Sequence, residues 1–335
     1  MAAASRPATE RTLMNRTQIA CACALAAAGV GLAGPALAQN FTDWGNPMPV
    51  SINTPANEGC PIEAPDGLGL YIASNRPGGY GALDVWRALR ADVDAPWGVP
   101  ENLGSTVNSG DFDYCPTPRN GRWLLYVSSL DTENDGDPAN DDCLPGPPAP
   151  PPPGRPAAGD MGLTQQRPDG SWRAPMHLGC FPQGPNTAGF EFSPSPFETE
   201  GGQTVLYFSS NGYPDSQGQD IYASAMLADG TVLPGQRVAE LSSPADDRMP
   251  NVRKDGLEIV FSSNRQGFNA QDIYVATRAS TSDPWSAPVR IANPAINTAS
   301  AETRASLSGD GTRLYFGRDG DVFVSTRSKV RGPSD

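Results

Sequence analysis

Three short sequence signals recur in the same order along most of the chain. The first is an extended, β-rich segment that ends in Ser-Asn-Arg or a close variant, the second is an Asp that precedes a short strand, and the third is a Trp-x-x-Pro segment. The first signal begins at Leu70, Leu124, Val205, Ile259 and Leu314, the second at Asp84, Asp160, Asp220, Asp272 and Asp321, and the third at Trp44, Trp97, Trp172 and Trp285. Short β-rich runs separated by turn residues, without a helical period, predict an antiparallel all-β fold.

Each repeat predicts four strands. The first strand ends at a turn such as Pro65-Asp66-Gly67, in which the Asp-Gly pair suits a tight hairpin. The three recurring signals then mark the second, third and fourth strands. Four strands in each repeat of about 50 residues are the pattern of a β-propeller blade.

The two ends of the repeat array complement each other. The fifth repeat stops after its third strand, near Arg327, and a spare fourth strand lies at the opposite end of the array, in residues 43–49. Donating that strand to the last blade would close the ring and remove exposed sheet edges. We therefore predict a five-bladed β-propeller with four antiparallel strands per blade, closed by an N-terminal strand.

These residues resemble the WD40-like β-propeller repeat of TolB-type periplasmic proteins. The resemblance extends over nearly all of the repeat array, from about Trp44 to Thr326. It implies a propeller fold and says little about function. TolB itself has six blades and an additional N-terminal domain, so the resemblance does not imply a TolB role.

The N-terminal residues have the pattern of an export signal. Arg11 and Arg16 precede an apolar, Ala-rich run over residues 19–32, and Pro35-Ala36-Leu37-Ala38 is a small-x-small cleavage site. We predict a cleaved signal peptide over residues 1–38 and a single propeller domain over residues 39–335. We expect a periplasmic or secreted protein, because no later apolar stretch is long enough to cross a membrane.

The predicted mature chain is strongly acidic. Without residues 1–38 it has 21 basic and 36 acidic residues, a net charge of −15. This balance argues against nucleic acid and anionic lipid as partners, since both require a basic surface. It is compatible with cations, neutral sugars or basic proteins, and also with solubility alone. We expect a monomer.

Four cysteines follow the predicted cleavage site, and an even number in an oxidising compartment predicts two disulfides. Cys60 and Cys115 occupy the same position in the first strands of neighbouring blades, whereas Cys143 and Cys180 share one repeat. We predict the pairs Cys60–Cys115 and Cys143–Cys180. A structural zinc site is not expected, because His177 is the only histidine and no Cys-x-x-Cys spacing occurs.

Every repeat places one carboxylate at the start of its first strand, five residues after a small polar residue. The carboxylates are Glu58, Asp113, Glu191, Asp247 and Glu302, and the small polar residues are Asn53, Asn108, Asn186, Ser242 and Asn297. In a propeller these acids would encircle one mouth of the central channel, where they could bind a cation or a polar ligand. Arg248 and Arg304 would lie beside two of them and could neutralise part of the ring, and we include both arginines in the predicted ligand-binding set.

A structural role explains the same regularity. Each carboxylate could accept hydrogen bonds from backbone N–H groups of its own turn or of the next blade, and recurrence in every blade favours this interpretation over catalysis. The recurring Asp of the third strand is also interpreted as structural, with Ser, Asn or Arg at the end of the second strand as its partner. The tryptophans are interpreted as outer-strand packing.

The second repeat departs from the pattern. Residues 131–159 form an insertion between its second and third strands, acidic at first and then Pro-rich. We expect it to overhang the acidic mouth, where loops on a rigid scaffold often carry function. The acids from Asp131 to Asp137 are spaced somewhat like a calcium loop, but the terminal Glu and flanking helices are missing. No cofactor is firmly implied, and a divalent cation such as calcium is the one candidate.

Two functions remain open. The favoured one is an exported binding or scaffold protein that holds a protein, peptide, glycan or cation at the acidic mouth, because the repeats are even and no nucleophile–base pair is recognisable. The alternative is a carbohydrate-active enzyme of glycoside hydrolase type. Glu58, Asp113 and Glu191 would then supply the acid, the base and a carboxylate that tunes their pKa.

Overall fold

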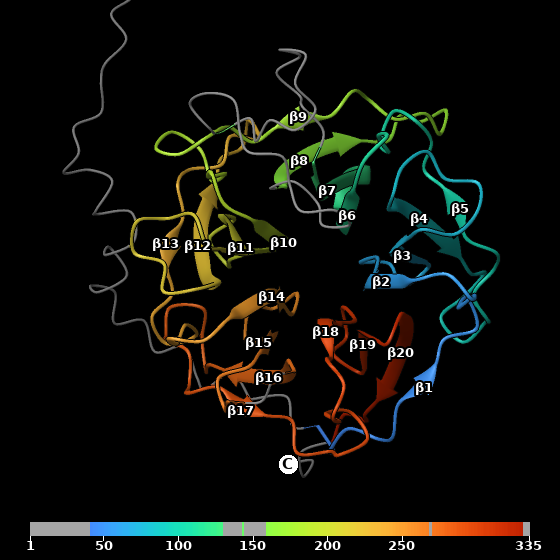
Figure 1. Ribbon diagram of the computed structural model, residues 1–335. Helices are drawn as coiled ribbons and strands as arrows, with labels where there is room; N and C mark the ends of the chain where they lie inside the picture. Colours follow the sequence, from blue (N-terminus) through green and yellow to red (C-terminus); the bar gives the residue numbers. More distant parts are fainter. Residues whose placement is uncertain (1–40, 130–142, 144–158, 268–269, 331–335) are drawn as a thin grey trace, which may run out of the picture. The chain divides into compact units, whose positions relative to one another are not determined.

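A computed structural model of the protein describes residues 41–129, 143, 159–267 and 270–330. In it, twenty strands form five four-stranded antiparallel sheets arranged around a central axis (Figure 1). The predicted five-bladed β-propeller with four antiparallel strands per blade is therefore confirmed. The predicted signal peptide and nearly all of the insertion lie outside the described residues.

The strands follow the order of the sequence repeats. Blade 1 comprises β2 (Glu58–Glu63), β3 (Gly69–Ser74), β4 (Asp84–Leu89) and β5 (Glu101–Asn102). Blade 2 comprises β6 (Asp113–Arg119), β7 (Trp123–Ser128), β8 (Asp160–Gln165) and β9 (Met176–His177). Blade 3 comprises β10 (Glu191–Glu198), β11 (Thr204–Ser210), β12 (Asp220–Met226) and β13 (Gln236–Arg237). Blade 4 comprises β14 (Asp247–Val252), β15 (Glu258–Ser263), β16 (Asp272–Thr277) and β17 (Val289–Arg290).

Blade 5 takes its strands from both ends of the described chain. It comprises β18 (Thr303–Leu307), β19 (Arg313–Arg318), β20 (Asp321–Thr326) and β1 (Met48–Pro49). β1 pairs antiparallel with β20, with Met48 opposite Val324 and Pro49 opposite Phe323. Asn53 extends this connection, since its side chain hydrogen-bonds both the N–H and the C=O of Val322.

The fourth strands differ from the prediction. The Trp-x-x-Pro segments were expected to form them, but the strands contain two residues each and begin after the proline, as β5 does after Trp97 and Pro100. Proline lacks an N–H group and cannot complete a ladder. The tryptophans instead lie against arginines: the Arg90 guanidinium lies 4.1 Å from the Trp97 ring centroid, and Arg278 lies 4.2 Å from that of Trp285.

The core lies between neighbouring blades. The second strand of a blade is apolar and buried on both faces, because each sheet is covered by the next sheet on either side. In β15 every residue is buried, and its Val260 packs with Leu314 and Phe316 of blade 5. Leu70 and Ile72 of blade 1 pack in turn against Tyr315. The apolar packing thus continues from blade 5 to blade 1 across the two ends of the array.

Helical structure is almost absent from the described ranges. The one helix that they contain is a three-residue 3-10 helix, Asn120–Arg122. No helix in these ranges is long and apolar enough to cross a membrane.

Candidate functional site

The first strands of the blades surround the central axis and contact one another from blade to blade (Figure 1). Each of the five predicted carboxylates lies at or directly before the first residue of such a strand, in β2, β6, β10, β14 and β18. The predicted register, with one carboxylate at the start of each innermost strand, is therefore present in every blade. The five side chains are nonetheless buried, with residue exposures between 0% and 3%.

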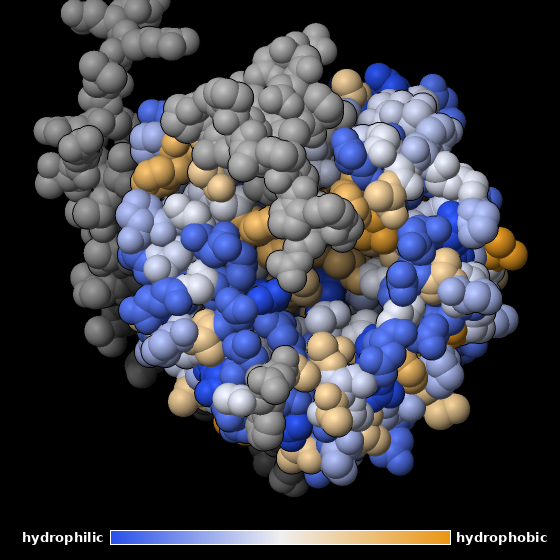
Figure 2. Space-filling view, viewed as in Figure 1, coloured by the Kyte–Doolittle hydropathy of each residue, from blue (hydrophilic) through white to orange (hydrophobic). Residues whose placement is uncertain are grey.

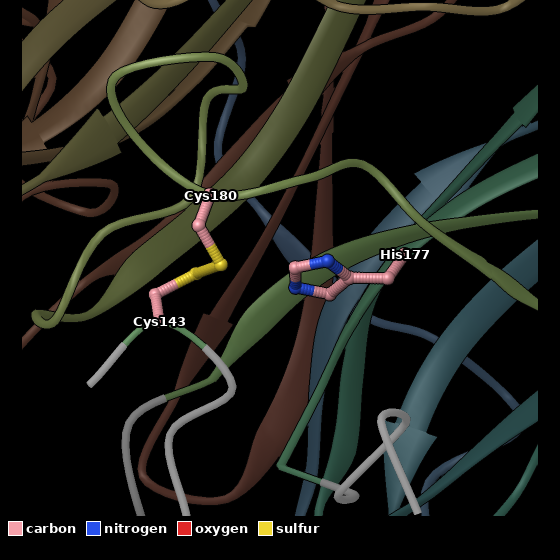
Figure 3. Close-up of side chains that lie close together, drawn as sticks. All are labelled: Cys143, His177 and Cys180. Carbon is pink, nitrogen blue, oxygen red and sulfur yellow. A yellow bond between two sulfur atoms is a disulfide. The ribbon is translucent and has the colours of Figure 1, made fainter. Parts of the chain in front are cut away.

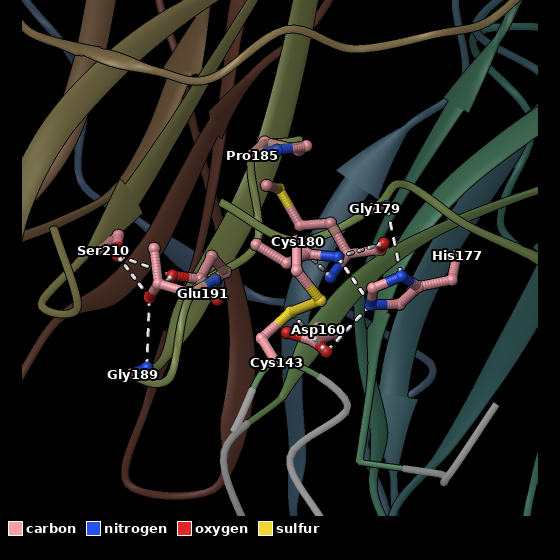
Figure 4. The surroundings of a disulfide bond; sticks show 12 residues. Cys143, Asp160, His177, Gly179, Cys180, Pro185, Gly189, Glu191 and Ser210 are labelled. Atoms are coloured by element: carbon pink, nitrogen blue, oxygen red, sulfur yellow. Dashed lines mark hydrogen bonds and ion pairs between the residues drawn. A yellow bond between two sulfur atoms is a disulfide. The ribbon is translucent and has the colours of Figure 1, made fainter. Parts of the chain in front are cut away.

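Each carboxylate is bound by the residue four positions earlier, a Thr or Ser. Thr187 donates its backbone N–H to Glu191 Oε2 at 3.1 Å and its hydroxyl to Oε1 at 2.6 Å. Ser109 does the same for Asp113 at 2.6 and 2.8 Å. Thr54, Ser243 and Thr298 repeat this arrangement in the other blades. A serine at the end of the second strand adds a further hydroxyl, as Ser210 does for Glu191 (Figure 4).

The backbone of the same residues connects neighbouring blades. The N–H of each carboxylate residue donates to the carbonyl group that precedes the third-strand Asp of the blade before it, at 2.7 to 3.3 Å. The Asn five residues upstream bonds the backbone of that third strand, as Asn108 does with the N–H and C=O of Val85. Asn53, Asn186 and Asn297 form equivalent bridges, and Ser242 forms a shorter one. The structural interpretation predicted the backbone N–H groups that each carboxylate accepts from its own turn, and these blade-to-blade contacts are additional to them.

Arginines neutralise three of the five carboxylates. Arg76 lies 3.0 Å from Glu58, Arg265 lies 2.5 Å from Asp247, and Arg318 lies 3.7 Å from Glu302. Asp113 and Glu191 have no arginine partner in the part of the chain that the structure describes. The charge is therefore compensated unevenly, and blades 2 and 3 contain the two carboxylates held by neutral donors alone.

Because no arginine pairs with these two carboxyl groups among the described residues, burial raises their pKa values. Desolvation raises the pKa of Asp113 to about 6, against the opposing hydrogen bonds from Ser109 and Ser128. Desolvation likewise raises the pKa of the Glu191 carboxyl well above its usual value. Burial also raises the pKa of Glu302, where the more distant Arg318 opposes the rise. Asp113 and Glu191 are the candidate proton donors of this mouth.

Aromatic residues flank the same two carboxylates. The sequences are Phe112-Asp113-Tyr114 in blade 2 and Phe190-Glu191-Phe192 in blade 3, whereas the other blades have Asn57 and Gly59, Asp246 and Arg248, and Ala301 and Thr303 at these positions. The rings of Phe190 and Phe192 are stacked at 6.0 Å, and Phe192 lies 5.9 Å from Tyr114. Phe112, Phe190 and Phe192 are half-buried. We call Phe112, Tyr114, Phe190 and Phe192 the aromatic sector.

The surface of the mouth reflects this asymmetry. Figure 2 shows hydrophobic surface beside the central opening next to β6 and β10, while the side next to β14 is mainly hydrophilic. The sequence contains the signal that identifies the aromatic sector, namely aromatic residues on both sides of the carboxylate in two neighbouring repeats. It was missed because the register was compared for the acids alone.

The two predicted arginines have different surroundings. Arg248 forms its ion pair with Asp246 and makes no ion pair with a first-strand carboxylate among the described residues. Arg304 is fully buried at 1% exposure and reaches from blade 5 to the hydroxyl of Thr117 in blade 2 at 3.0 Å. Neither arginine neutralises the ring of acids, which corrects the expected charge compensation.

Four of the five third-strand aspartates, those of blades 1 to 4, are held within their own blades, but by a partner other than the predicted one. Asp220 pairs with Arg237 and Asp272 with Arg290 at 2.8 Å, so the partner comes from the fourth strand rather than the end of the second. In blade 1 the partner is Asn102, whose side-chain amide donates a hydrogen bond to Asp84. In blade 2 it is His177, whose Nε2 lies 2.8 Å from Asp160 (Figure 4).

One predicted disulfide is present and the other is not. Cys143 and Cys180 are joined, which connects the insertion to the segment after β9 (Figure 3). Cys60 and Cys115 are free thiols with their Sγ atoms 2.8 Å apart, so the predicted bond between them is absent. The ligand atoms of Cys143, His177 and Cys180 lie within 4.8 Å of one another. Because the disulfide uses both sulfurs, no thiolate remains there to ligate a metal. The candidate calcium loop lies outside the described residues.

The fold is shared with carbohydrate-active propellers. An endo-arabinase from Bacteroides thetaiotaomicron VPI-5482 is 14% identical, with a TM-score of 0.52 over 89% of this chain and 100% of that one. An α-L-arabinofuranosidase from Podospora anserina is 12% identical, with a TM-score of 0.51 over 86% of this chain and 98% of that one. A thermostable family-43 glycoside hydrolase is 14% identical, with a TM-score of 0.50 over 86% and 99%.

Sequence comparisons add no relative. No protein-family model matches the chain, and no curated protein matches it. The resemblance to the WD40-like repeat therefore stays a prediction. At 12 to 14% identity, the likeness to the three solved structures shows the propeller fold alone.

Proposed function

We propose that the protein is an exported, non-enzymatic binding protein that holds a glycan or a peptide at the aromatic sector. The observation that carries this proposal is the break in symmetry at blades 2 and 3. Aromatic residues flank the carboxylate there, and the arginine found in the other three blades is missing. Half-buried, stacked aromatic rings offer flat apolar faces for sugar rings or apolar side chains.

The buried carboxylates favour binding over hydrolysis. A glycosidase requires two carboxyl groups that reach the scissile bond from the open site. Glu58 and Glu191 are 3% and 0% exposed, and their oxygens accept hydrogen bonds from their own turns and second strands. The raised pKa values of Asp113 and Glu191 would suit a general acid, and the three solved relatives are glycoside hydrolases by name, so hydrolysis is the second candidate.

Export is part of the proposal. The Cys143–Cys180 disulfide supports an oxidising compartment, and the signal-like pattern of residues 1–38 supports the same location. The excess of acidic residues makes nucleic acid an unsuitable partner. A periplasmic or secreted monomer with a ligand at the mouth is consistent with all three features.

Phe190→Ala is expected to weaken ligand binding about fivefold, because the change removes a stacking face worth about 1 kcal/mol. The measurement is calorimetric titration of the mature protein with arabino-oligosaccharides, cello-oligosaccharides and a peptide library. Asn57→Ala is the matched control, since Asn57 occupies the same position in blade 1, is exposed, and its backbone N–H is bound in the same way as that of Phe190. Equal losses in the two variants would show that the aromatic sector is not the binding site, and product release by the wild type would favour the hydrolase.

A further inference from the structure

Each blade contributes one residue at an equivalent position of its innermost strand. Each first strand contains a β-bulge two residues after its carboxylate, and the bulge residue has a positive φ between 49° and 58°. A positive φ is uncommon for residues other than glycine, and here it turns the side chain away from the sheet faces. The five bulge residues are Cys60, Cys115, Ser193, Met249 and Arg304.

Contacts among these residues cross the channel. The Sγ atoms of Cys60 and Cys115 are 2.8 Å apart, although the two strands belong to different blades. The hydroxyl of Ser193 donates to the Cys115 sulfur at 3.4 Å. Arg304 spans from blade 5 to the carbonyl of Pro250 in blade 4 and to Thr117 in blade 2. Two thiols, a hydroxyl and a guanidinium therefore meet near the propeller axis.

Arg304 brings an uncompensated charge to this cluster. It forms no ion pair with a carboxylate among the described residues, and its Nε atom is buried without a hydrogen-bond partner. A buried cation is stable only with a counter-charge or sufficient hydrogen bonds. The charge of Arg304 acts on the thiols of Cys60 and Cys115, which can become anions. The hydrogen bond from Cys60 and the charge of Arg304 lower the pKa of Cys115 to about 7, against the effect of burial, and the pKa of the Cys60 thiol is raised in turn.

We propose that Cys60 and Cys115 form a redox-active dithiol that reacts with low-molecular-weight disulfides entering the channel. Its reduced state contains one thiolate, on Cys115, which accepts the Cys60 S–H and faces Arg304. Cys60 is half-buried and Cys115 is fully buried, so an incoming disulfide reaches Cys60 first.

The reaction is a thiol–disulfide exchange in two steps. The Cys60 thiol passes its proton to the Cys115 thiolate, and the Cys60 sulfur attacks one sulfur of the incoming disulfide. The other sulfur leaves as a thiolate, takes the proton from Cys115 and departs as a thiol, which restores the Cys115 thiolate. The Cys115 thiolate then attacks Cys60 Sγ and releases the second thiolate. Across both steps, the two cysteines lose two electrons to the incoming disulfide. Its two halves leave as one thiol, which carries the proton of the pair, and one thiolate. The product links β2 of blade 1 to β6 of blade 2.

A redox titration of the mature protein tests this directly. The protein is equilibrated in buffers of reduced and oxidised glutathione, quenched with iodoacetamide, and mapped by non-reducing peptide mass spectrometry. We expect Cys60 and Cys115 to change together from two alkylated thiols to one linked peptide, while Cys143–Cys180 remains joined. Two thiols that stay alkylatable in oxidised glutathione, a stable glutathione adduct on Cys60, or a Cys115–Cys143 link would each overturn the proposal.

The role of Arg304 has its own measurement. The ultraviolet absorbance of the thiolate should rise with a midpoint near pH 7 in the wild type. In Arg304→Met the midpoint should move upward and disulfide formation at pH 7 should slow about fivefold, since a pKa rise of about one unit from near 7 lowers the thiolate fraction at pH 7 by about that factor. Arg248→Met is the matched control, because Arg248 pairs with Asp246. If Arg304→Met does not fold, a wild-type midpoint above about 8.5, the value of an ordinary thiol, would contradict the thiolate.

Discussion

Asp247→Asn is expected to lower the free energy of unfolding by about 3 kcal/mol at neutral pH, because it leaves a mostly buried arginine without its counter-charge. Arg265 approaches Asp247 Oδ1 with both Nε and Nη2 and is 16% exposed at its side chain. Arg265 also donates to the carbonyl of Leu241 and to the hydroxyl of Ser263, neither of which carries a charge. Urea denaturation of the variant and the wild type gives the difference directly.

Asp113→Asn is the matched change in blade 2, and above pH 7 it should raise the free energy of unfolding rather than lower it. The folded pKa of Asp113, about 6, exceeds its unfolded value of 3.8, so its contribution to stability is complete below about pH 4 and is lost as the pH rises through 6. At pH 8 the ionised group costs about 3 kcal/mol at most, and the amide avoids this cost while still bonding Ser109 and Ser128. We expect Asp113→Asn to be about 1 to 3 kcal/mol more stable than the wild type at pH 8, with no gain at pH 4. Equal destabilisation in both variants would contradict the assignment of charges.

Asn297→Ala is expected to cost about 3 kcal/mol, because it leaves buried backbone groups without partners. The Asn297 side chain accepts the N–H of Ile273 at 2.7 Å and donates to the carbonyls of Ile273 and Ile291. The carbonyl of Ile273 keeps the N–H of Ile291 as a partner, so the N–H of Ile273 and the carbonyl of Ile291 are the two groups left without one. An orphaned buried polar group costs about 1 to 3 kcal/mol, and the two together account for the expected loss.

The chain itself supplies the conservative variant. Ser242 takes the position of this Asn in blade 3, and its hydroxyl bonds both the N–H and the C=O of Ile221. Asn297→Ser should therefore lose about half of what Asn297→Ala loses. If the free energy of unfolding of the alanine variant lies within about 1 kcal/mol of the wild-type value, the blade-to-blade bridge contributes little to the stability of the ring.

The register of the repeats predicted the fold because each of its signals has one dominant physical cause. Asp-Gly turns recur in blades 1, 4 and 5. Buried second strands, and a carboxylate five residues after a small polar residue as in Asn108 and Asp113, recur in every blade. The fourth strands were harder to predict. Trp97 marks the outer edge of its blade through its contact with Arg90 rather than through strand pairing, and a sequence does not distinguish these two roles.

The candidate site was predictable only in part. The positions of Glu58 and its four counterparts followed from the register, but their burial did not, because it depends on contacts from the preceding blade. The charge of Arg304 was expected to neutralise an acid, and the positive φ of the bulge turns it across the channel instead. The proximity of Cys60 and Cys115 followed from their equivalent positions. Whether they are bonded depends on redox conditions, which a sequence does not specify.

The central claim is that the ring of carboxylates holds the blades together and that ligands bind beside it. Incubating the purified mature protein with arabino-oligosaccharides, alongside Glu191→Gln, tests this most directly. The account predicts no hydrolysis by either protein and equal ligand affinity in both, since Glu191 is buried beneath the aromatic sector. Hydrolysis by the wild type that disappears in Glu191→Gln would contradict it.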